Sequence, residues 1–403
     1  MPLSQGRKIL AIPGPSVIPD RVLNAMHRAS PNIYEGEIVS EVEGMIPDLR
    51  AVARTEHEVA IYICNGHGAW EASLRNVVKP GDRILAIQTG RFGTNWGVLA
   101  SQMGVDVQKL DFGMQSPADA NKLEEVLRAD TEGKIKAVTT VQVDTATSVK
   151  NDVAELKNAI VAAGHDALFM VDCIASLGCD RYEMDAWGAD VTVAACQKGL
   201  MTPPGLGFVY FNDKAKSFRK HAVPGQYWDW VPRAEPEIFY QYFGGTPPVS
   251  HLYGLREALD MLVHEEGIEN VWSRHEALAG AYWAALDAWG SKGSMKHNIA
   301  DRAFRTVAVS TIETAEDDAQ KIRDWCEKEA GVTLGIGIGF GTPSSAEARR
   351  RFRIGHMGHN NIPMMMGVAG AIDAAMKALG IEHGEGALEA ASRALAASVN
   401  RNA

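Results

Sequence analysis

Two ionisable side chains, Asp172 and Lys198, follow the ends of two apolar runs. A carboxylate and an amine in these positions could act together in catalysis. Residues 191–196 (VTVAAC) and 167–171 (ALFMV) are predicted to be buried parallel strands, because each is a short, continuous apolar run. A lysine at the end of a buried strand loses hydration, which favours its neutral and nucleophilic amine. Both side chains would then face the crevice in which open α/β sheets bind ligands.

This pair matches the needs of pyridoxal 5'-phosphate (PLP). A lysine holds the aldehyde of that cofactor, and a carboxylate keeps its pyridine nitrogen protonated, so that the ring can act as an electron sink. Lys198 alone could instead be a lysine whose side chain leaves the end of the strand for solvent. Asp172 at the end of the preceding strand is what favours the cofactor site.

The segments around both residues resemble one enzyme family. DCIASLG (172–178) and CQKGLMTPPGLGF (196–208) are similar to the class V (subgroup IV) aminotransferases, most of all to serine–glyoxylate and alanine–glyoxylate aminotransferases. The resemblance extends from a PGP turn at 13–15 to RIGHMG at 353–358 and the helices that follow. It implies an α/β fold of the aspartate-aminotransferase type (fold type I) and PLP as the cofactor. It also implies ping-pong transamination between a small amino acid, such as serine or alanine, and glyoxylate or pyruvate.

Further cofactor contacts follow from the same resemblance. Residues 59–78 predict a strand, a turn and a helix whose N-terminus suits a phosphate, and Gly66 and His67 match the phosphate-binding turn of the family. Phe92, in a predicted loop after a strand at 84–88, matches the aromatic residue that stacks on the pyridine ring, although a core phenylalanine is the alternative. Thr145 matches the residue that contacts the phenolic oxygen of the cofactor, and Ser148 replaces a glycine of the relatives. The resemblance also assigns Ile174 and Gln197 to the cofactor site.

Three residues are candidates for substrate and subunit contacts. Arg353 would bind the substrate carboxylate through two parallel hydrogen bonds; the alternative is a surface arginine paired with an acid, in which case Arg351 or Arg91 is the next candidate. Tyr34 would line the substrate pocket, unless it is simply an exposed loop residue. Thr246, in GGTPPVS, matches a residue that reaches the phosphate of the neighbouring subunit's cofactor, which implies a homodimer.

Length and pattern predict two domains in the 403 residues, at 1–265 and 266–403. The first would contain the large PLP-binding domain, with residues 208–211 as an edge strand of its mostly parallel sheet. The second is predicted to be a smaller α/β domain. Its elements would be strands at 304–311, 332–337 and 351–354, a helix at 316–330 and further helices from about 363.

Composition argues against several partners. The net charge is −10 and the longest basic run is 349–351, so we expect no nucleic acid and no anionic membrane as a partner. No apolar stretch approaches the roughly 20 residues of a membrane span, and the N-terminus has no secretory pattern. The five cysteines show no CxxC spacing, and we expect no metal site and a cytoplasmic location.

Two other functions use the same scaffold. One is a PLP-dependent lyase of the cysteine desulfurase or kynureninase type. A desulfurase needs a reactive cysteine on a mobile loop, whereas the only candidate, Cys326, lies in a predicted helix (KIRDWCEKEAG). The other is a cofactor-binding regulator fused to a DNA-binding module, for which the sequence contains no helix-turn-helix pattern.

Overall fold

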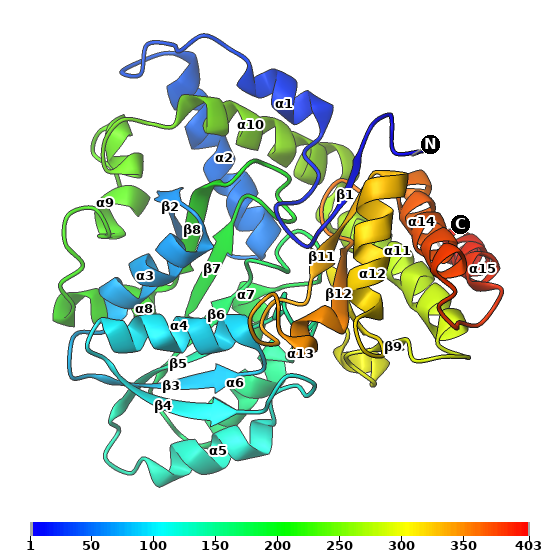
Figure 1. Ribbon diagram of the computed structural model, residues 1–403. Helices are drawn as coiled ribbons and strands as arrows, with labels where there is room; N and C mark the ends of the chain where they lie inside the picture. Colours follow the sequence, from blue (N-terminus) through cyan, green and yellow to red (C-terminus); the bar gives the residue numbers. More distant parts are fainter. Residues whose placement is uncertain (1–2, 402–403) are drawn as a thin grey trace.

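The computed structural model describes residues 3–401 and contains two β-sheets with helices packed around them (Figure 1). The larger sheet has seven strands in the order β2-β8-β7-β6-β5-β3-β4. The smaller sheet has five strands in the order β1-β11-β12-β10-β9. This is the α/β architecture, with a mostly parallel large sheet, that the sequence predicted.

The strands of the larger sheet are β2 (Glu58–Cys64), β3 (Arg83–Gln88), β4 (Asp106–Asp111), β5 (Ile135–Val141), β6 (Leu168–Asp172), β7 (Val191–Ala195) and β8 (Gly205–Phe211). All neighbours are parallel except β8, which runs antiparallel to both β2 and β7. The prediction that 208–211 is an edge strand is therefore wrong. β8 pairs on both sides, and its residues from Leu206 to Phe211 are buried on both faces of the sheet.

Side chains alternate between two cores, one on each face of this sheet. In β6, Leu168 and Met170 join the core under α3 (Gly66–Val77) and α4 (Arg91–Gln102), whereas Phe169 and Val171 join the opposite core. The helices of the opposite face are α2 (Glu37–Ala53), α5 (Ala120–Ala129), α6 (Val153–Ala162), α7 (Met184–Trp187) and α10 (Val249–Leu259). α1 (Asp20–Met26) packs on α10, and α8 (Asp213–Phe218) and α9 (Val231–Ala234) follow β8.

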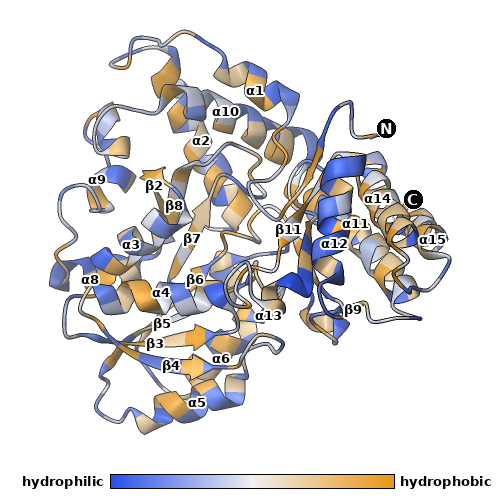
Figure 2. Ribbon diagram, viewed as in Figure 1, coloured by the Kyte–Doolittle hydropathy of each residue, from blue (hydrophilic) through white to orange (hydrophobic). Residues whose placement is uncertain are grey.

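The smaller sheet contains β1 (Ile9–Ala11), β9 (Lys296–His297), β10 (Val309–Glu313), β11 (Val332–Ile336) and β12 (Arg351–Gly355). Its helices are α11 (Ile268–Trp289), α12 (Asp318–Trp325), α13 (Ala346–Arg349), α14 (Ile362–Leu379) and α15 (Ala387–Arg401). The predicted strand at 304–311 begins only at Val309, because Arg302–Phe304 forms a 3-10 helix. Figure 2 shows α12 as largely hydrophilic and the strands β3 and β7 of the larger sheet as mainly hydrophobic.

The N-terminal segment connects the two sheets. β1 pairs in parallel with β11, so residues 9–11 lie in the smaller sheet, whereas the predicted range 1–265 combined an N-terminal segment with the large domain. The chain then passes the end of β7 and reaches α1, which packs against α10. The division into domains at residue 265 stays a prediction.

One described helix, α14, is long and apolar enough to cross a membrane by length and composition alone. Its Val368, Ile372 and Met376 are buried in the core that α11, α12 and α15 share. An apolar inner face of this kind is expected of a helix that packs inside a domain.

Candidate active site

Residues from five strands meet at one edge of the larger sheet, because β2, β3, β5, β6 and β7 run in the same direction. Asp172 is the last residue of β6, and Lys198 follows the end of β7. The turns after β2, β3 and β5 carry, respectively, the predicted cofactor residues Gly66 and His67, Phe92, and Thr145. Carboxyl ends of parallel strands are where α/β sheets place their ligands.

Lys198 is buried against the N-terminal PGP turn. Its Nζ donates a hydrogen bond of 2.6 Å to the Pro13 carbonyl, and the Ser16 hydroxyl donates one of 2.7 Å to the Lys198 carbonyl. Gly14 has a φ of +103°, and a Cβ there would lie 2.4 Å from Lys198 Cε and Nζ, so glycine suits both the backbone conformation and the close approach. Burial, with a smaller effect from the Arg353 charge, lowers the pKa of Lys198 to about 8. A larger fraction of neutral amine is therefore available at neutral pH than for an exposed lysine.

Asp172 is held by two donors. The indole Nε1 of Trp70 donates a hydrogen bond of 2.9 Å to Oδ2, and the Ile174 N–H donates one of 2.6 Å to Oδ1. Burial raises the pKa of Asp172 to about 7, although both hydrogen bonds act to lower it. A cation beside this carboxyl group would lower its pKa and thereby keep it ionised.

Phe92 lies in the first turn of α4, and not in a loop as predicted. The buried Asp144 carboxylate accepts the N–H groups of Phe92 (2.7 Å) and Gly93 (3.4 Å) and thereby starts the helix early. The Phe92 ring is half-buried and stands edge-on to Trp70, with ring centroids 6.3 Å apart. Its proposed stacking on a cofactor stays a prediction.

The loop after β5 contacts the smaller sheet through Thr145, whose carbonyl accepts a hydrogen bond of 2.9 Å from Arg353 Nη1. Ser148, which replaces a glycine of the relatives, keeps a glycine-type backbone with φ of +61°. Its hydroxyl accepts the Thr311 N–H at 3.1 Å. This hydrogen bond helps a non-glycine residue to hold the left-handed conformation.

The predicted phosphate turn begins α3 at Gly66. A Cβ at Gly66 would lie 2.5 Å from Ile174 Cδ1, so Gly66 and Ile174 are in close contact. The Asn65 side chain caps the helix by accepting the N–H groups of His67 (3.1 Å) and Gly68 (3.4 Å). A phosphate at this turn would share these donors with Asn65. The Gln197 amide oxygen is buried beside Lys198 and has no hydrogen-bond partner in the described chain, which leaves this amide available to a bound group.

The guanidinium of Arg353, on β12, points to the edge of the larger sheet that carries Lys198 and Asp172. Nε donates to the Ile336 carbonyl (2.7 Å) and Nη1 to the Thr145 carbonyl (2.9 Å). Within residues 3–401, no carboxylate forms a salt bridge with Arg353, although the residue is only 7% exposed. Burial lowers its pKa to about 9. A buried guanidinium without an acid is an available anion site.

The alternative substrate arginine, Arg351, is already paired. Its guanidinium forms salt bridges of 3.0 Å with Glu313 and Glu347. It also lies 4.2 Å from the centre of the Phe340 ring. These contacts leave Arg353 as the better candidate for a substrate carboxylate.

Two predicted site residues are not brought to this crevice by the chain itself. The Tyr34 side chain is 77% exposed, and Thr246 is exposed in the loop before α10. No hydrogen bond in the described chain links either residue to Lys198, Asp172 or Arg353. Their roles stay predictions.

Two residues at the site were not identified from the sequence. Trp70 binds Asp172, and the Pro13 carbonyl binds Lys198. Trp70 follows Gly66 by one helical turn, so a donor facing the same crevice was a possible inference from GHGAWEA. Nothing in the local sequence indicates the Pro13 contact, because it joins residues 185 positions apart in the chain.

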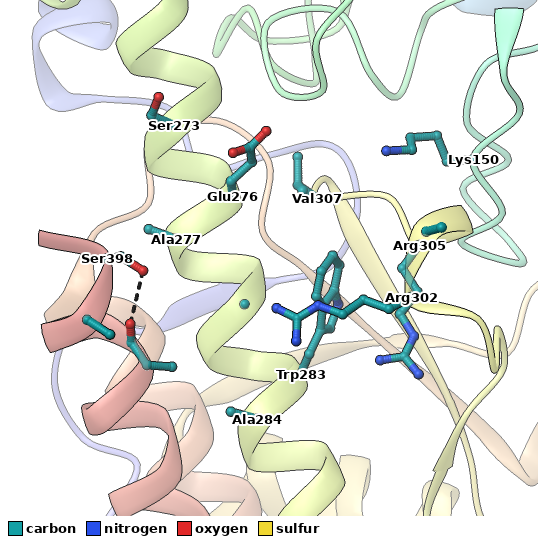
Figure 3. A pocket seen from close by; sticks show the side chains of 14 residues that line it. Lys150, Ser273, Glu276, Ala277, Trp283, Ala284, Arg302, Arg305, Val307 and Ser398 are labelled. Atoms are coloured by element: carbon teal, nitrogen blue, oxygen red, sulfur yellow. Dashed lines mark hydrogen bonds between the residues drawn. The ribbon is translucent and has the colours of Figure 1, made fainter. Parts of the chain in front are cut away.

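One large cavity and one group of possible metal ligands lie apart from the predicted site residues. A large cavity of about 790 Å³ lies between α11, α15 and the segment at 302–307, where Trp283 stands beside Arg302 (Figure 3). None of the predicted site residues lines it. Asp48, Asp260 and His264 form a group with metal-ligand geometry, but Asp48 and Asp260 already pair with Arg256.

Cys326 has the environment of an inert thiol. It is buried at the start of a π-helical turn, Cys326–Ala330, that continues α12, and burial raises its pKa to about 12. A desulfurase nucleophile must be exposed and ionised. The helix predicted around Cys326 is confirmed.

Comparison with known proteins identifies the family. The pattern of class-V aminotransferases matches residues 13–346. A serine–glyoxylate aminotransferase of Methylorubrum extorquens is 37% identical over 375 residues, which cover 91% of this chain and 90% of the relative. An L-aspartate–glyoxylate aminotransferase of Paracoccus denitrificans is 32% identical over 380 residues and covers 92% and 91%. The solved ureidoglycine–glyoxylate aminotransferase of Bacillus subtilis superposes with a TM-score of 0.85 at 23% identity and covers 97% and 99%.

The crevice fits the cofactor of this family. It offers a buried lysine with a lowered pKa, a buried acid on the neighbouring strand and an unpartnered Gln197 amide. Lysine and acid are the two groups that PLP needs from a protein. The chain belongs to the class-V aminotransferase family and is a PLP-dependent aminotransferase of fold type I.

Proposed function

We propose that this enzyme transfers the amino group of a small amino acid to glyoxylate or pyruvate by a ping-pong mechanism. The observation that carries the proposal is the convergence of three buried groups at one edge of the larger sheet. These are the lysine amine, the strand-end acid and an arginine without an acid partner. The names of the similar enzymes, two of which use glyoxylate with serine or aspartate, support the acceptor.

Each of the three groups has a proposed task. PLP, when bound, supplies an electron sink that stabilises negative charge at the donor Cα. Arg353 orients the carboxylate of the amino acid through its free N–H groups. The Lys198 amine removes the Cα proton, since its lowered pKa leaves part of it neutral near pH 7. Asp172 places a fixed negative charge beside the ring nitrogen of the cofactor.

The remaining predicted contacts belong to the same proposal. Gly66 and His67 would hold the phosphate, Phe92 and Ile174 would flank the ring, Thr145 would contact the phenolic oxygen, and Gln197 would contact the cofactor. The Gln197 amide oxygen, buried without a partner in the described chain, could accept a hydrogen bond from a donor on the bound group.

The active enzyme would be a homodimer. Thr246 is exposed and follows Gly244 and Gly245, both of which have positive φ. Its proposed contact is with the cofactor phosphate of a second subunit.

The decisive test is an amino-donor screen. Serine, alanine and aspartate are each offered to the cofactor-loaded enzyme with glyoxylate or pyruvate, and the keto-acid and amino-acid products are quantified. Omission of the acceptor should allow a single turnover that leaves pyridoxamine phosphate on the enzyme, which a lyase would not accumulate. Borohydride reduction of the cofactor-loaded enzyme before any donor is added, followed by peptide mapping, should find the cofactor on Lys198. Label on another lysine would contradict the assignment.

A further inference from the structure

The arginines around β12 fall into two groups that differ in their partners. Arg349, Arg350 and Arg351 pair with acids, with distances of 2.7 Å to Asp317 for Arg349 and 3.0 Å to Glu313 for Arg351. By contrast, Arg91, Arg323 and Arg353 form no salt bridge with any acid in the part of the chain described. Acids are therefore present nearby, but only the first group forms salt bridges with them; Asp324 and Glu327 act on Arg323, and Asp144 on Arg353, through their charges alone.

The three unpaired arginines lie close to one another. The charges of Arg323 and Arg91 both act on Arg353 and contribute to the lowering of its pKa. The Arg91 charge also acts on His67 of the predicted phosphate turn. Because a guanidinium stays protonated in proteins, this group keeps its positive charges and favours a bound anion.

Arg91 and Arg323 line a small cavity next to Arg353. Its volume is about 160 Å³, and its wall includes Ile336, whose carbonyl accepts the Arg353 Nε–H. The loop from Gly337 to Gly341 closes one side, and Gly339 approaches Arg91 so closely that a Cβ there would lie 3.0 Å from Arg91 Cβ. A volume of this size corresponds to about five water molecules, or to a short carboxylate chain.

One of these guanidiniums has a buried donor without a partner. Arg323 Nη1 donates to Gln320 at 2.8 Å, whereas its Nε is buried and unpartnered within the described residues. A buried, unsatisfied charged donor costs stability unless a ligand binds it. A carboxylate could accept from Nε and Nη2 together.

We propose that Arg91 and Arg323 form a second carboxylate subsite beside Arg353, so that the preferred donor is a dicarboxylic amino acid such as aspartate. This inference rests on the proposed function, since Arg353 would bind the first carboxylate. The cavity beyond Arg353 would receive the distal one. A neutral side chain such as that of alanine or serine would leave both cavity arginines without an anion.

The kinetic test compares donors within each variant. The quantity is the ratio of kcat/KM for L-aspartate to that for L-alanine, with a fixed acceptor, because this ratio cancels losses common to both donors. Arg323→Gln should lower it about tenfold or more, as expected for one lost charged pair. Arg323→Lys should keep part of the preference, since it keeps the charge but not the fork. Arg349→Gln, a matched loss of a nearby arginine outside the cavity, should leave it unchanged. An unchanged ratio in Arg323→Gln and Arg91→Gln would overturn the inference.

A binding measurement separates this inference from the proposed function. Titration calorimetry of the cofactor-loaded protein should show that succinate binds at least about tenfold more tightly than propionate. This preference should disappear in Arg323→Gln. Equal affinities in the unmodified protein would refute the second subsite even if transamination is confirmed. Selective succinate binding that is lost in Arg323→Gln would support the second subsite even if the enzyme turns over no amino donor.

Discussion

The hydrogen bond from Trp70 to Asp172 offers the sharpest test of how the site controls its acid. Trp70→Phe removes the indole N–H, which lies 2.9 Å from Asp172 Oδ2, and keeps an aromatic ring in the cluster with Phe92 and Trp96. A hydrogen bond to a charged group contributes about 1.5–3 kcal/mol, and about 1.4 kcal/mol corresponds to one pKa unit.

The loss should therefore raise the pKa of Asp172 in the cofactor-free protein from about 7 to about 8–9. At pH 7 the ionised fraction would fall from about one half to between about 1% and 10%. If cofactor binding requires the ionised acid, PLP affinity at pH 7 should fall about 5- to 50-fold and should recover as the pH rises.

Calorimetric titration of the cofactor-free protein with PLP at several pH values measures this change. Trp96→Phe is the matched control: its ring stacks on Trp70 with centroids 6.1 Å apart, but its Nε1 has no partner among residues 3–401. That variant shares the change in ring volume and should keep the pH profile of the unmodified protein. Equal profiles for Trp70→Phe and Trp96→Phe would refute the role of this hydrogen bond.

Four further outcomes follow from the geometry. Arg353→Lys should raise KM for donor and keto acid by about tenfold or more in steady-state kinetics, because lysine cannot reproduce the fork; an unaltered KM for both would place the carboxylate elsewhere. The folded pKa of Lys198 (about 8) lies below its ordinary value of 10.5, so the unfolded chain binds the extra proton between these values. The cofactor-free protein should thus gain stability to urea as the pH rises through that window, and Lys198→Met should lack this gain. Thr246→Ala should weaken cofactor binding in the dimer, whereas an active, cofactor-loaded monomer in sedimentation would rule out the shared site. Cys326→Ala should keep the transamination rate in the donor screen, since this buried thiol takes no part in it; a lost rate at normal stability would show that the thiol does take part.

The sequence predicted the elements that carry the site because their local signals are strong. Buried parallel strands are continuous apolar runs, so the strands that end at Asp172 and before Lys198 were recognisable. The helix α11 (Ile268–Trp289) shows local signals that are equally strong, since Gly267 precedes it and Gly290 follows its last apolar residue.

Contacts between distant parts of the chain could not be predicted in this way. The position of β8 inside the sheet depends on pairing with β2, which lies far upstream. Likewise, Arg351 and Arg353 are separated by one residue, yet only the fold gives one of them two acids and the other none. Local sequence patterns cannot assign such partners, because strand pairing and side-chain burial decide them.

The pairing of β1 with β11 has a consequence for how the enzyme is made. Ile9 pairs opposite Val332, so β1 cannot take its place until most of the chain has left the ribosome. The larger sheet can form earlier, since domains tend to fold as units during synthesis. Pro13 lies two residues after the end of β1 and accepts the Lys198 hydrogen bond, so this contact can form only after β11, in the last third of the chain, has been translated. A nascent chain could therefore carry a folded large sheet before the hydrogen bond between Lys198 and Pro13 can form.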